Sequence, residues 1–429
     1  MAIFILVCFL GLMIIGVPIG FVLGLTAIFS ILQLDNPIFM NMVSQRFFSG
    51  MNSYVFLSFP LFLLAGDIMN SIGLTSRIVN FTNIFFGKLR GGLAHVNIVT
   101  SIMFGGISGS AIADTAALGS IFIPAMEKEG YDREFSTAVT AASSVISPII
   151  PPSIIMVIYG ALMGVSIAGL FAAGIIPGLM IGIGLMIVTR FIAKKRNYPR
   201  SEEKVTLPRV VKGTREAIWA LMMPLIVLGG ILGGIFTPTE AAVVAVVYAL
   251  FLGFVVYRNL SLKVLYNLLL NNAIMLGIII LILSAAAVVG WLMAMEHIPQ
   301  MVADLFTSFT SNKYMILLMI NLLLIVVGML MDISASLIIL APVLAPLAAA
   351  IGIHPLHFGT MMCVNLSIAL ITPPMGGCLF MGMVIGKVEF GPLVKAVWPY
   401  IVVEMVVLAL IVLFPEFTLF IPKLLGFAV

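Results

Sequence analysis

Two long stretches of this 429-residue sequence contain no Lys, Arg, Asp or Glu. They run from Phe135 to Thr189 and from Ile333 to Gly386. Because about 20 apolar residues cross a bilayer as one helix, each stretch holds more than one membrane-embedded segment. Only 9% of all residues are charged, which excludes a soluble enzyme, a nucleic-acid binder and a disordered protein. The runs also lack the alternation of a lipid-facing β-barrel, so the sequence predicts an all-α polytopic membrane protein.

Proline interrupts both uncharged stretches at corresponding places. Pro151 and Pro152 break the first stretch, and Pro373 and Pro374 break the second. Proline removes a backbone donor and frees a carbonyl one turn earlier, so both places are predicted breaks within helices. Other apolar runs have the length of single spans. These predicted spans are 55–72, 217–239, 241–257, 264–295 and 314–331.

The basic residues are concentrated in one segment. Nine of the 21 Lys and Arg residues fall between Arg190 and Arg215. Since positively charged loops stay on the cytoplasmic side, residues 190–215 are predicted to form a cytoplasmic linker. This linker separates a first half, 1–189, from a second half, 216–429.

The two halves repeat each other when the first is shifted by 222 residues. An internal repeat of broken apolar helices is typical of secondary transporters and marks their binding site. The repeated regions, each with a predicted hairpin and a Pro-Pro break, are about 93–165 and 314–390; the pattern leaves parallel and inverted arrangements open. The coinciding pairs are Gly106/Gly328, Pro124/Pro346, Gly130/Gly352, Pro151/Pro373, Pro152/Pro374, Gly160/Gly382, Gly164/Gly386, Gly169/Gly391 and Pro177/Pro399.

Two polar clusters occupy equivalent positions of the repeat. Ser110 matches Asp332, and Asp114 matches Ser336, so each half has an Asp and a Ser four residues apart on one predicted helix face. An Asp in an apolar run is a functional candidate because its charge is costly in lipid. The alternative is a carboxylate that only caps a helix N-terminus. Both roles are compatible with the pattern.

The Pro-Pro breaks predict two cation sites. Freed carbonyls at Ser147 and Ile150, and at Ala369 and Thr372, offer the oxygen ligands that hard cations such as sodium take. The facing breaks are expected to approach them through Gly106, Ser108 and Gly328. The alternative is a pair of proline hinges whose carbonyls are satisfied by water.

Several motifs together resemble the large membrane subunit of tripartite ATP-independent periplasmic (TRAP) transporters, over about residues 1–420. The resemblance implies two inverted repeats, each with a re-entrant helical hairpin, in an elevator whose transport domain slides against a scaffold. It also implies two or more sodium ions as coupling ions, no nucleotide, a location in the bacterial inner membrane, and an acidic substrate delivered by a periplasmic binding protein. A small four-helix membrane subunit is expected as a separate chain. The motifs begin at Gly106, Ile123, Pro148 and Thr237.

The resemblance also implies site residues. Ala111 stands where relatives often have a second serine after Ser110, and the first repeat is more similar to the sialic-acid branch than to the C4-dicarboxylate branch. The implied first sodium site comprises Gly106, Ser108, Ser147, Ile150 and Pro152, and the second comprises Gly328, Ala369, Thr372 and Met375. The predicted substrate-binding residues are Ser108, Ser110, Asp114, Asp332, Ser334, Ser336 and Asn365.

The leading hypothesis is a sodium-coupled elevator importer of a carboxylate-bearing solute, with Asp114 and Asp332 essential for uptake. A proton-driven carrier of similar build is an alternative, in which one of these carboxylates cycles a proton. A third hypothesis is an intramembrane serine protease, because Gly106 to Gly109 fit its Gly-x-Ser-Gly motif. It requires a His within hydrogen-bond reach of Ser108.

Overall fold

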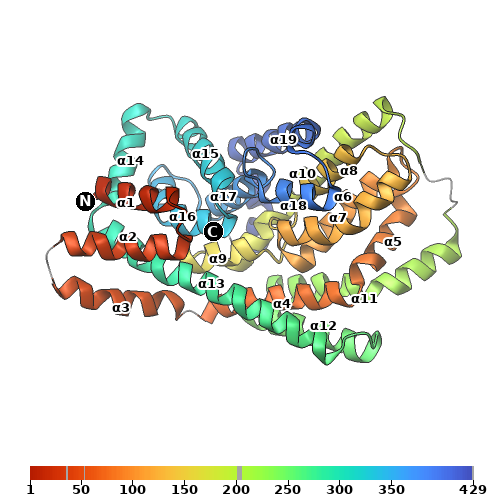
Figure 1. The fold of residues 1–429 in the computed structure, drawn as a ribbon, viewed down its shortest axis with the longest axis horizontal. Helices are drawn as coiled ribbons and strands as arrows, with labels where there is room; N and C mark the ends of the chain where they lie inside the picture. The colour runs from red at the N-terminus through yellow and green to blue at the C-terminus, as the bar shows by residue number, and fades with distance from the viewer. Residues whose placement is uncertain (35–36, 53, 201–204, 428–429) are drawn as a thin grey trace.

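The computed structural model describes residues 1–34, 37–52, 54–200 and 205–427. These residues form twenty α-helices, one short 3-10 helix and one π-helical turn, and no β-strand (Figure 1). Eight of the described helical segments are long and apolar enough to cross a membrane. The predicted all-α polytopic class is confirmed.

Each half contributes ten α-helices. The first half contains α1 (Ala2–Ile14), α2 (Ile19–Gln33), α3 (Pro37–Met51), η1 (Tyr54–Leu57), α4 (Ser58–Ser71), α5 (Leu74–Phe86), α6 (Gly92–Ser108), α7 (Ala111–Lys128), α8 (Arg133–Ser144), α9 (Ile154–Met163) and α10 (Ile167–Lys195). The second half contains α11 (Leu207–Leu232), α12 (Pro238–Phe251), η2 (Leu252–Val256), α13 (Leu262–Met295), α14 (Ile298–Phe309), α15 (Lys313–Leu330), α16 (Ile333–Ala350), α17 (Pro355–Ala369), α18 (Gly377–Gly386), α19 (Phe390–Leu413) and α20 (Glu416–Leu424).

The sequence repeat reappears in the helix boundaries. Helix α7 begins at Ala111 and α16 at Ile333, which are 222 residues apart, and α6 and α15 end at Ser108 and Leu330, again 222 apart. A Pro-Pro break then follows α8 and α17, with a cis bond between its two prolines in each case. The repeated regions therefore build the same succession of helices, α6–α9 in the first half and α15–α18 in the second. That the two repeats have opposite orientations in the membrane stays a prediction.

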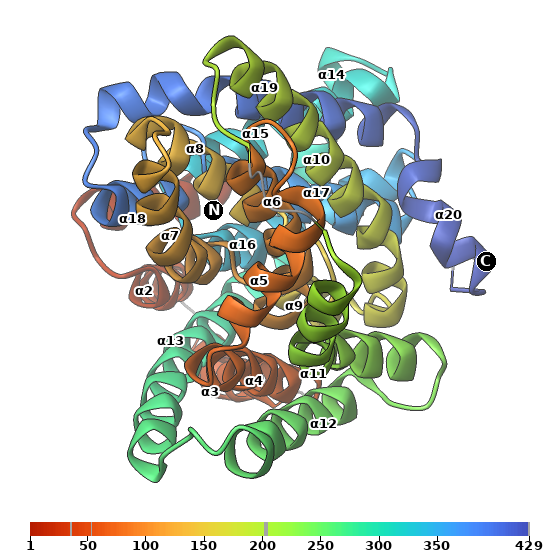
Figure 2. The same cartoon turned by 90° about the vertical axis from the view of Figure 1, so that its right-hand side faces the viewer.

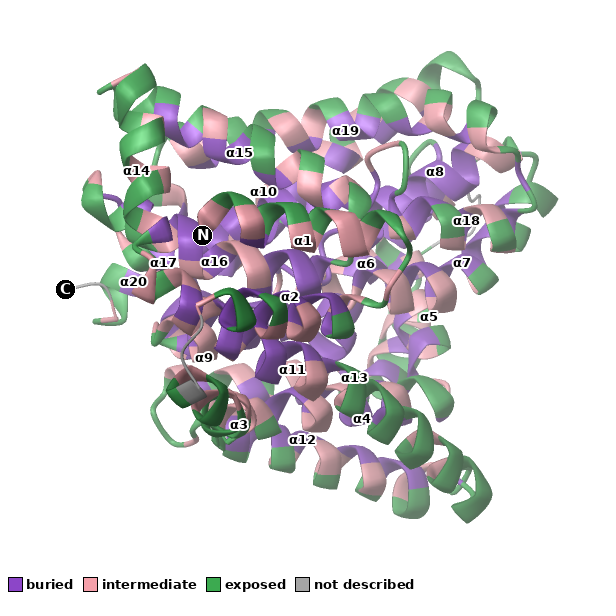
Figure 3. Ribbon diagram, turned by 60° about the vertical axis from the view of Figure 1, so that its left-hand side comes forward, coloured by how far each residue is buried: buried purple, intermediate pink, exposed green. Residues whose placement is uncertain are grey.

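The helices after the two breaks are exchanged between the halves. Helix α9 packs on α16 of the second half, while α18 packs on α7 of the first half (Figure 2). Helix α19 likewise packs on α8, and α10 on α17. The buried residues gather where these helices meet, whereas the outer faces of α12 and α14 are largely exposed (Figure 3). Helices α6–α10 and α15–α19 thus share one core.

A second group of helices borders this core. Helix α13 packs against α2, α3 and α4, α12 packs along α4, and α11 connects α12 to α5. This group runs along the lower side of the molecule in Figure 1. It meets the shared core where α5 and α4 contact α6, where α4 contacts α9 and where α13 contacts α16. We call it the border group and the other the repeat core.

The helices on either side, α10 and α11, both extend into the basic segment 190–215. Helix α10 continues to Lys195 and α11 begins at Leu207, so only a short part of the described segment lies outside helices. Arg196 and the Tyr198 hydroxyl both donate to Oδ2 of Asp132, just before α8. Burial raises the pKa of Tyr198 to about 12, which keeps it a neutral donor. The part of the segment directly after α10 is therefore anchored to the repeat core.

Candidate functional site

Two helix starts from equivalent repeat positions meet at one cavity. Ser110 is the N-cap of α7 and accepts a hydrogen bond from the Ala113 amide (3.4 Å). Asp332 is the N-cap of α16 and accepts one from the Ser334 amide (2.8 Å). Ser110, Asp332 and Ser334 all line a cavity of about 580 Å³. The N-terminus of a helix carries partial positive charge and unpaired amide groups, so both starts present donors to a solute here.

The border group closes the other side of this cavity. Asp67 of α4 lines it, together with Asn271 and Asn272 of α13. The Asn272 side chain is buried and donates to the Pro60 carbonyl at 3.0 Å, which fixes α13 to α4 at this point. Sequence reasoning did not assign these three residues to the site. The adjacent Asn271 and Asn272 within a 34-residue apolar helix were the available signal.

A buried polar cluster lies behind the start of α7. Asp114 is fully buried, and the Ser108 hydroxyl donates to its Oδ1. Ser147, at the first break, places its hydroxyl 3.1 Å from Ser108 Oγ. Oδ2 of Asp114 is also buried and has no hydrogen-bond partner among the described residues. A carboxylate oxygen left in this state needs a cation or a proton, because burying an uncompensated charge is costly.

Backbone carbonyls of the first break approach the same region. A methyl group added at Gly106 would lie 3.3 Å from the Pro151 carbonyl oxygen, and one added at Gly109 would lie 2.8 Å from that of Pro152. Gly109 also has φ +61°, a conformation that favours glycine. The predicted residues Gly106, Ser108, Ser147 and Pro152 are thus brought together. Ile150 packs its side chain towards Gly178 of α10.

The second break is arranged differently. Gly328 meets Ala369, since a methyl group added at Gly328 would lie 2.7 Å from the Ala369 side chain. The Thr372 hydroxyl donates to the Ile368 carbonyl (2.9 Å), and the Met375 side chain is 55% exposed. Of the four predicted ligands, contacts in the described structure join Gly328 to Ala369 and Ala369 to Thr372, whose amide donates to the Ala369 carbonyl at 3.1 Å.

Four of the seven predicted substrate residues do not line this cavity: Ser108 and Asp114, which lie behind the start of α7, and Ser336 and Asn365. Ser336 is fully buried in α16, and its hydroxyl has no partner among the described residues. Asn365 is buried in α17 and donates to both the carbonyl oxygen (3.0 Å) and the side-chain oxygen (2.8 Å) of Asn321 in α15. These contacts make Asn365 a connection between two helices of the repeat core.

The environment of Ser108 bears on the protease hypothesis. Its hydroxyl contacts Asp114, Ser147 and the Ser110 amide. His357, by contrast, is buried and lies 2.7 Å from the Thr418 hydroxyl. Within the described residues Ser108 has no hydrogen bond to a histidine, so the arrangement lacks the base that a serine nucleophile requires.

Comparison with known proteins gives a consistent result over nearly the whole chain. The family described as tripartite ATP-independent periplasmic transporter, DctM component, matches residues 6–417. The sialic acid TRAP transporter large permease protein SiaM of Vibrio cholerae is 42% identical over 420 residues, or 97% of each chain. The 2,3-diketo-L-gulonate TRAP transporter large permease protein YiaN of Escherichia coli is 37% identical and covers 95% of this chain and 96% of its own.

Other similarities are more distant. The C4-dicarboxylate TRAP transporter large permease protein DctM of Rhodobacter capsulatus is 36% identical over 97% of this chain and 98% of its own. Among solved structures, the YdaH transporter of Alcanivorax borkumensis has a TM-score of 0.59 at 16% identity, covering 88% of each chain. At this identity the last similarity shows a shared fold alone.

Proposed function

Because the chain belongs to the family of TRAP transporter large permease subunits, multi-pass proteins of the bacterial inner membrane, we propose that it is a sodium-coupled importer of an acidic, hydroxyl-rich solute. The observation that carries this proposal is the cavity at which the starts of α7 and α16 meet the border group. The proposed solute is a sialic acid or a related sugar acid. The family to which the chain belongs transports solutes and is not a family of enzymes.

The cavity offers two kinds of group to such a solute. The helix starts at Ser110 and Asp332 present amide donors and positive dipole ends, which suit a carboxylate. Asp67, Asp332 and Asn271 supply acceptors for hydroxyl groups. A second carboxylate on the solute would lie close to these acidic side chains and would be repelled by them, because like charges repel at short distance. The lining therefore favours one carboxylate with several hydroxyls over a C4-dicarboxylate.

Sodium is the proposed coupling ion at the first break. The hydroxyls of Ser108 and Ser147, the free oxygen of Asp114 and the nearby Pro151 and Pro152 carbonyls are all hard oxygen donors. Asp114 supplies the negative charge that a buried cation needs. A second sodium ion is proposed at Gly328, Ala369, Thr372 and Met375 because of the repeat. A proton on Oδ2 of Asp114 is the competing interpretation of the same unpartnered oxygen.

The proposed motion is a displacement of the repeat core along the border group. The exchanged packing of α9 and α18 ties both hairpins into one unit, and the cavity lies between that unit and α4 and α13. A small membrane subunit is proposed to extend the border group, and a periplasmic binding protein is proposed to deliver the solute. Both proposals follow from family membership.

The test is uptake of a radiolabelled sialic acid into proteoliposomes that contain this chain and its small partner subunit. The cognate binding protein is added outside, and an inward sodium gradient is imposed or withheld. The proposal expects uptake that needs both sodium and the binding protein. Uptake of succinate in place of sialic acid would keep the mechanism and correct the substrate. Uptake that ignores sodium and collapses with a protonophore would replace sodium by protons at Asp114.

A further inference from the structure

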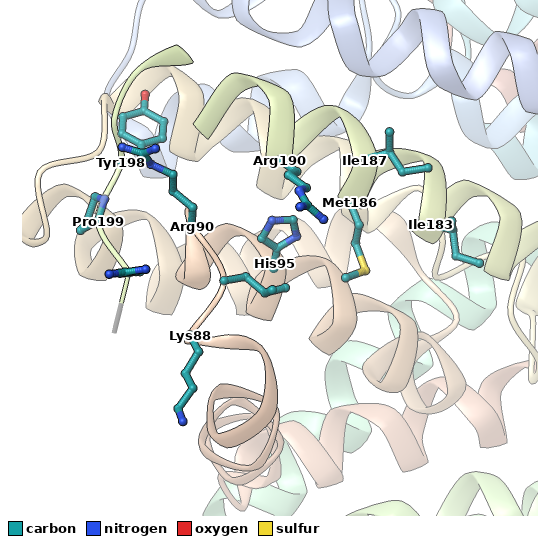
Figure 4. Close-up of a pocket in the computed structure, with 11 residues that line it drawn as sticks. Lys88, Arg90, His95, Ile183, Met186, Ile187, Arg190, Tyr198 and Pro199 are labelled. Carbon is teal, nitrogen blue, oxygen red and sulfur yellow. The ribbon is translucent and has the colours of Figure 1, made fainter. Parts of the chain in front are cut away.

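A second cavity, of about 810 Å³, lies apart from the proposed solute site. It is formed by the loop between α5 and α6, the last turns of α10 and the segment after α10 (Figure 4). The Arg90 side chain donates to Asn197 (2.5 Å), and the Gly91 amide donates to the Pro199 carbonyl (3.0 Å). These contacts join the loop before α6 to the segment after α10, so two walls of the cavity are connected by hydrogen bonds.

The charged side chains that line this cavity are all basic. They are Lys88, Arg90, Arg190 and Arg200. Asp132, the acid held by Arg196 and Tyr198, is not part of the wall. Lys88, Arg190 and Arg200 have no ion pair among the described residues. An anion in the cavity would meet uncompensated positive charge.

His95 gives the wall a buried polar atom that lacks a partner. Its ring is 2% exposed, lines the cavity and lies beside the Arg190 side chain (Figure 4). Its Nδ1 atom has no hydrogen-bond partner among the described residues. A buried polar atom in this state is rare in folded proteins, and a ligand with oxygen atoms satisfies it when the imidazole Nδ1 carries the hydrogen.

An apolar stripe leads from the lipid-facing surface into the cavity. Ile183 and Ile187 of α10 line the cavity and are 57% and 52% exposed, and Leu179 and Phe191 continue the row at a spacing of four residues. Residues four apart share one face of a helix. The row ends at Lys194 and Lys195, which the positive-inside rule places on the cytoplasmic side. Basic groups at this depth beside an exposed apolar row match the two ends of a phospholipid.

We propose that this cavity binds an anionic phospholipid of the cytoplasmic leaflet, with its phosphate between Arg190, Arg200 and His95 and its acyl chains along Ile183 and Ile187. The lipid fastens the segment after α10 to the start of α6. A free phosphate ester shares the headgroup chemistry but has nothing to place on the apolar row. The proposal does not depend on which solute or coupling ion the transporter uses.

The test measures binding of phosphatidylglycerol to the purified full chain in neutral detergent by native mass spectrometry. Each cation near a membrane surface contributes roughly a fivefold increase in affinity, so R190Q/R200Q is expected to lower affinity about 25-fold. The control K194Q/K195Q removes the same charge from exposed side chains of the neighbouring turn, outside the cavity, where solvent and salt screen them, and is expected to change affinity by less than about twofold. Gel-filtration profiles check that each variant is folded.

Two further measurements distinguish a phospholipid from a soluble phosphate ester as the ligand of this cavity. I183S/I187S is expected to weaken phosphatidylglycerol binding while leaving the basic residues in place. Glycerol 3-phosphate is expected not to displace the lipid at equal concentration. Equal losses in both charge variants would reduce the effect to surface electrostatics and overturn the proposal. Efficient displacement by glycerol 3-phosphate would show that a soluble phosphate ester is the ligand instead.

Discussion

The two Pro-Pro breaks have equivalent positions in the repeat but differ in how they are closed. At the first, Ser153 caps α9 by accepting from the Met156 amide and also donates to the Pro148 carbonyl, and every residue from Ser147 to Ser153 except Ile150 is buried. At the second, Met375 stands at the position of Ser153, and Pro374 and Met375 are exposed. The Ser153 hydroxyl therefore joins the two sides of the first break by hydrogen bonds, whereas the second break is exposed at the corresponding position.

The same contrast extends to the helix starts opposite the breaks. The first half has Ser110 as the cap and Asp114 buried behind it, whereas the second has Asp332 as the cap and Ser336 behind it. The exchange of Asp and Ser puts one carboxylate inside the protein and the other in the cavity wall. We infer that the buried carboxylate of the first half serves an ion, whereas the carboxylate of the second half serves the solute.

The largest effect is expected for Asp114→Ala. Loss of the carboxylate removes the partner of Ser108 and the free oxygen assigned to the ion. Two charge-assisted interactions of about 1.5–3 kcal/mol each correspond to at least a 100-fold fall in uptake at fixed sodium. Uptake at varied sodium concentration measures it. Uptake above half the wild-type rate would break the distinction between the halves.

A smaller effect is expected for Asp332→Ser. Serine still caps α16, so thermal stability is retained, but the acceptor in the cavity wall is lost. The KM for the solute should rise about tenfold, the value of one hydrogen bond near 1.4 kcal/mol, with the sodium dependence unchanged. Asp332→Ala should add a loss of stability. An unchanged KM in both variants would leave Asp332 as a cap alone.

A moderate loss of stability is expected for Ser153→Ala, with Met375→Ala as the matched control. Ser153→Ala removes an N-cap and a hydrogen bond, so the free energy of unfolding should fall by about 1–2 kcal/mol. Met375 is exposed and caps nothing, so its variant should leave the thermal midpoint in lipid unchanged. Equal shifts in the two variants would show that the two breaks are closed alike.

The smallest effect is expected for Ser336→Ala. Its hydroxyl is buried without a described partner, so removing it should change uptake by less than about twofold and leave stability equal or slightly higher. Ser108→Ala serves as the contrasting variant, because that hydroxyl contacts both Asp114 and Ser147. A severe loss of uptake in Ser336→Ala would assign an ion or solute contact to Ser336 itself.

Local signals explain what the sequence could predict. The breaks at Pro151 and Pro373 and the helix starts at Ser110 and Asp332 depend on residues within a turn, so residue type and spacing locate them. The single spans lie within a few residues of the predicted ranges, except for α11, which begins at Leu207, ten residues before the predicted start and inside the basic segment, and ends at Leu232, seven residues before the predicted end. The first turns of α11 are basic and continue directly into its apolar part, but their high content of Lys and Arg led to their prediction as part of the linker.

The cavity wall could not be predicted in the same way. Asp67 and Asn271 reach the cavity only because α13 packs along α4, some 200 residues earlier in the chain, and also contacts α16. Asn365 is the converse case, a residue that the sequence assigned to the substrate site and whose side chain donates to Asn321. Its position in the repeat core was clear, but its direction towards Asn321 depends on the packing of α15 against α17. Distant packing decides which polar side chains share a site.

The exchanged packing of α9 on α16 and α18 on α7 also has a consequence for how the polypeptide is made. Helix α9 of the first half packs on a helix of the second half, so it lacks this packing partner when the first half leaves the ribosome. The first half therefore stays incompletely packed in the bilayer until the second half is inserted. A chain severed between α10 and α11 should therefore regain activity only when both pieces are synthesised in the same cell, and each piece alone should be a substrate for membrane proteases.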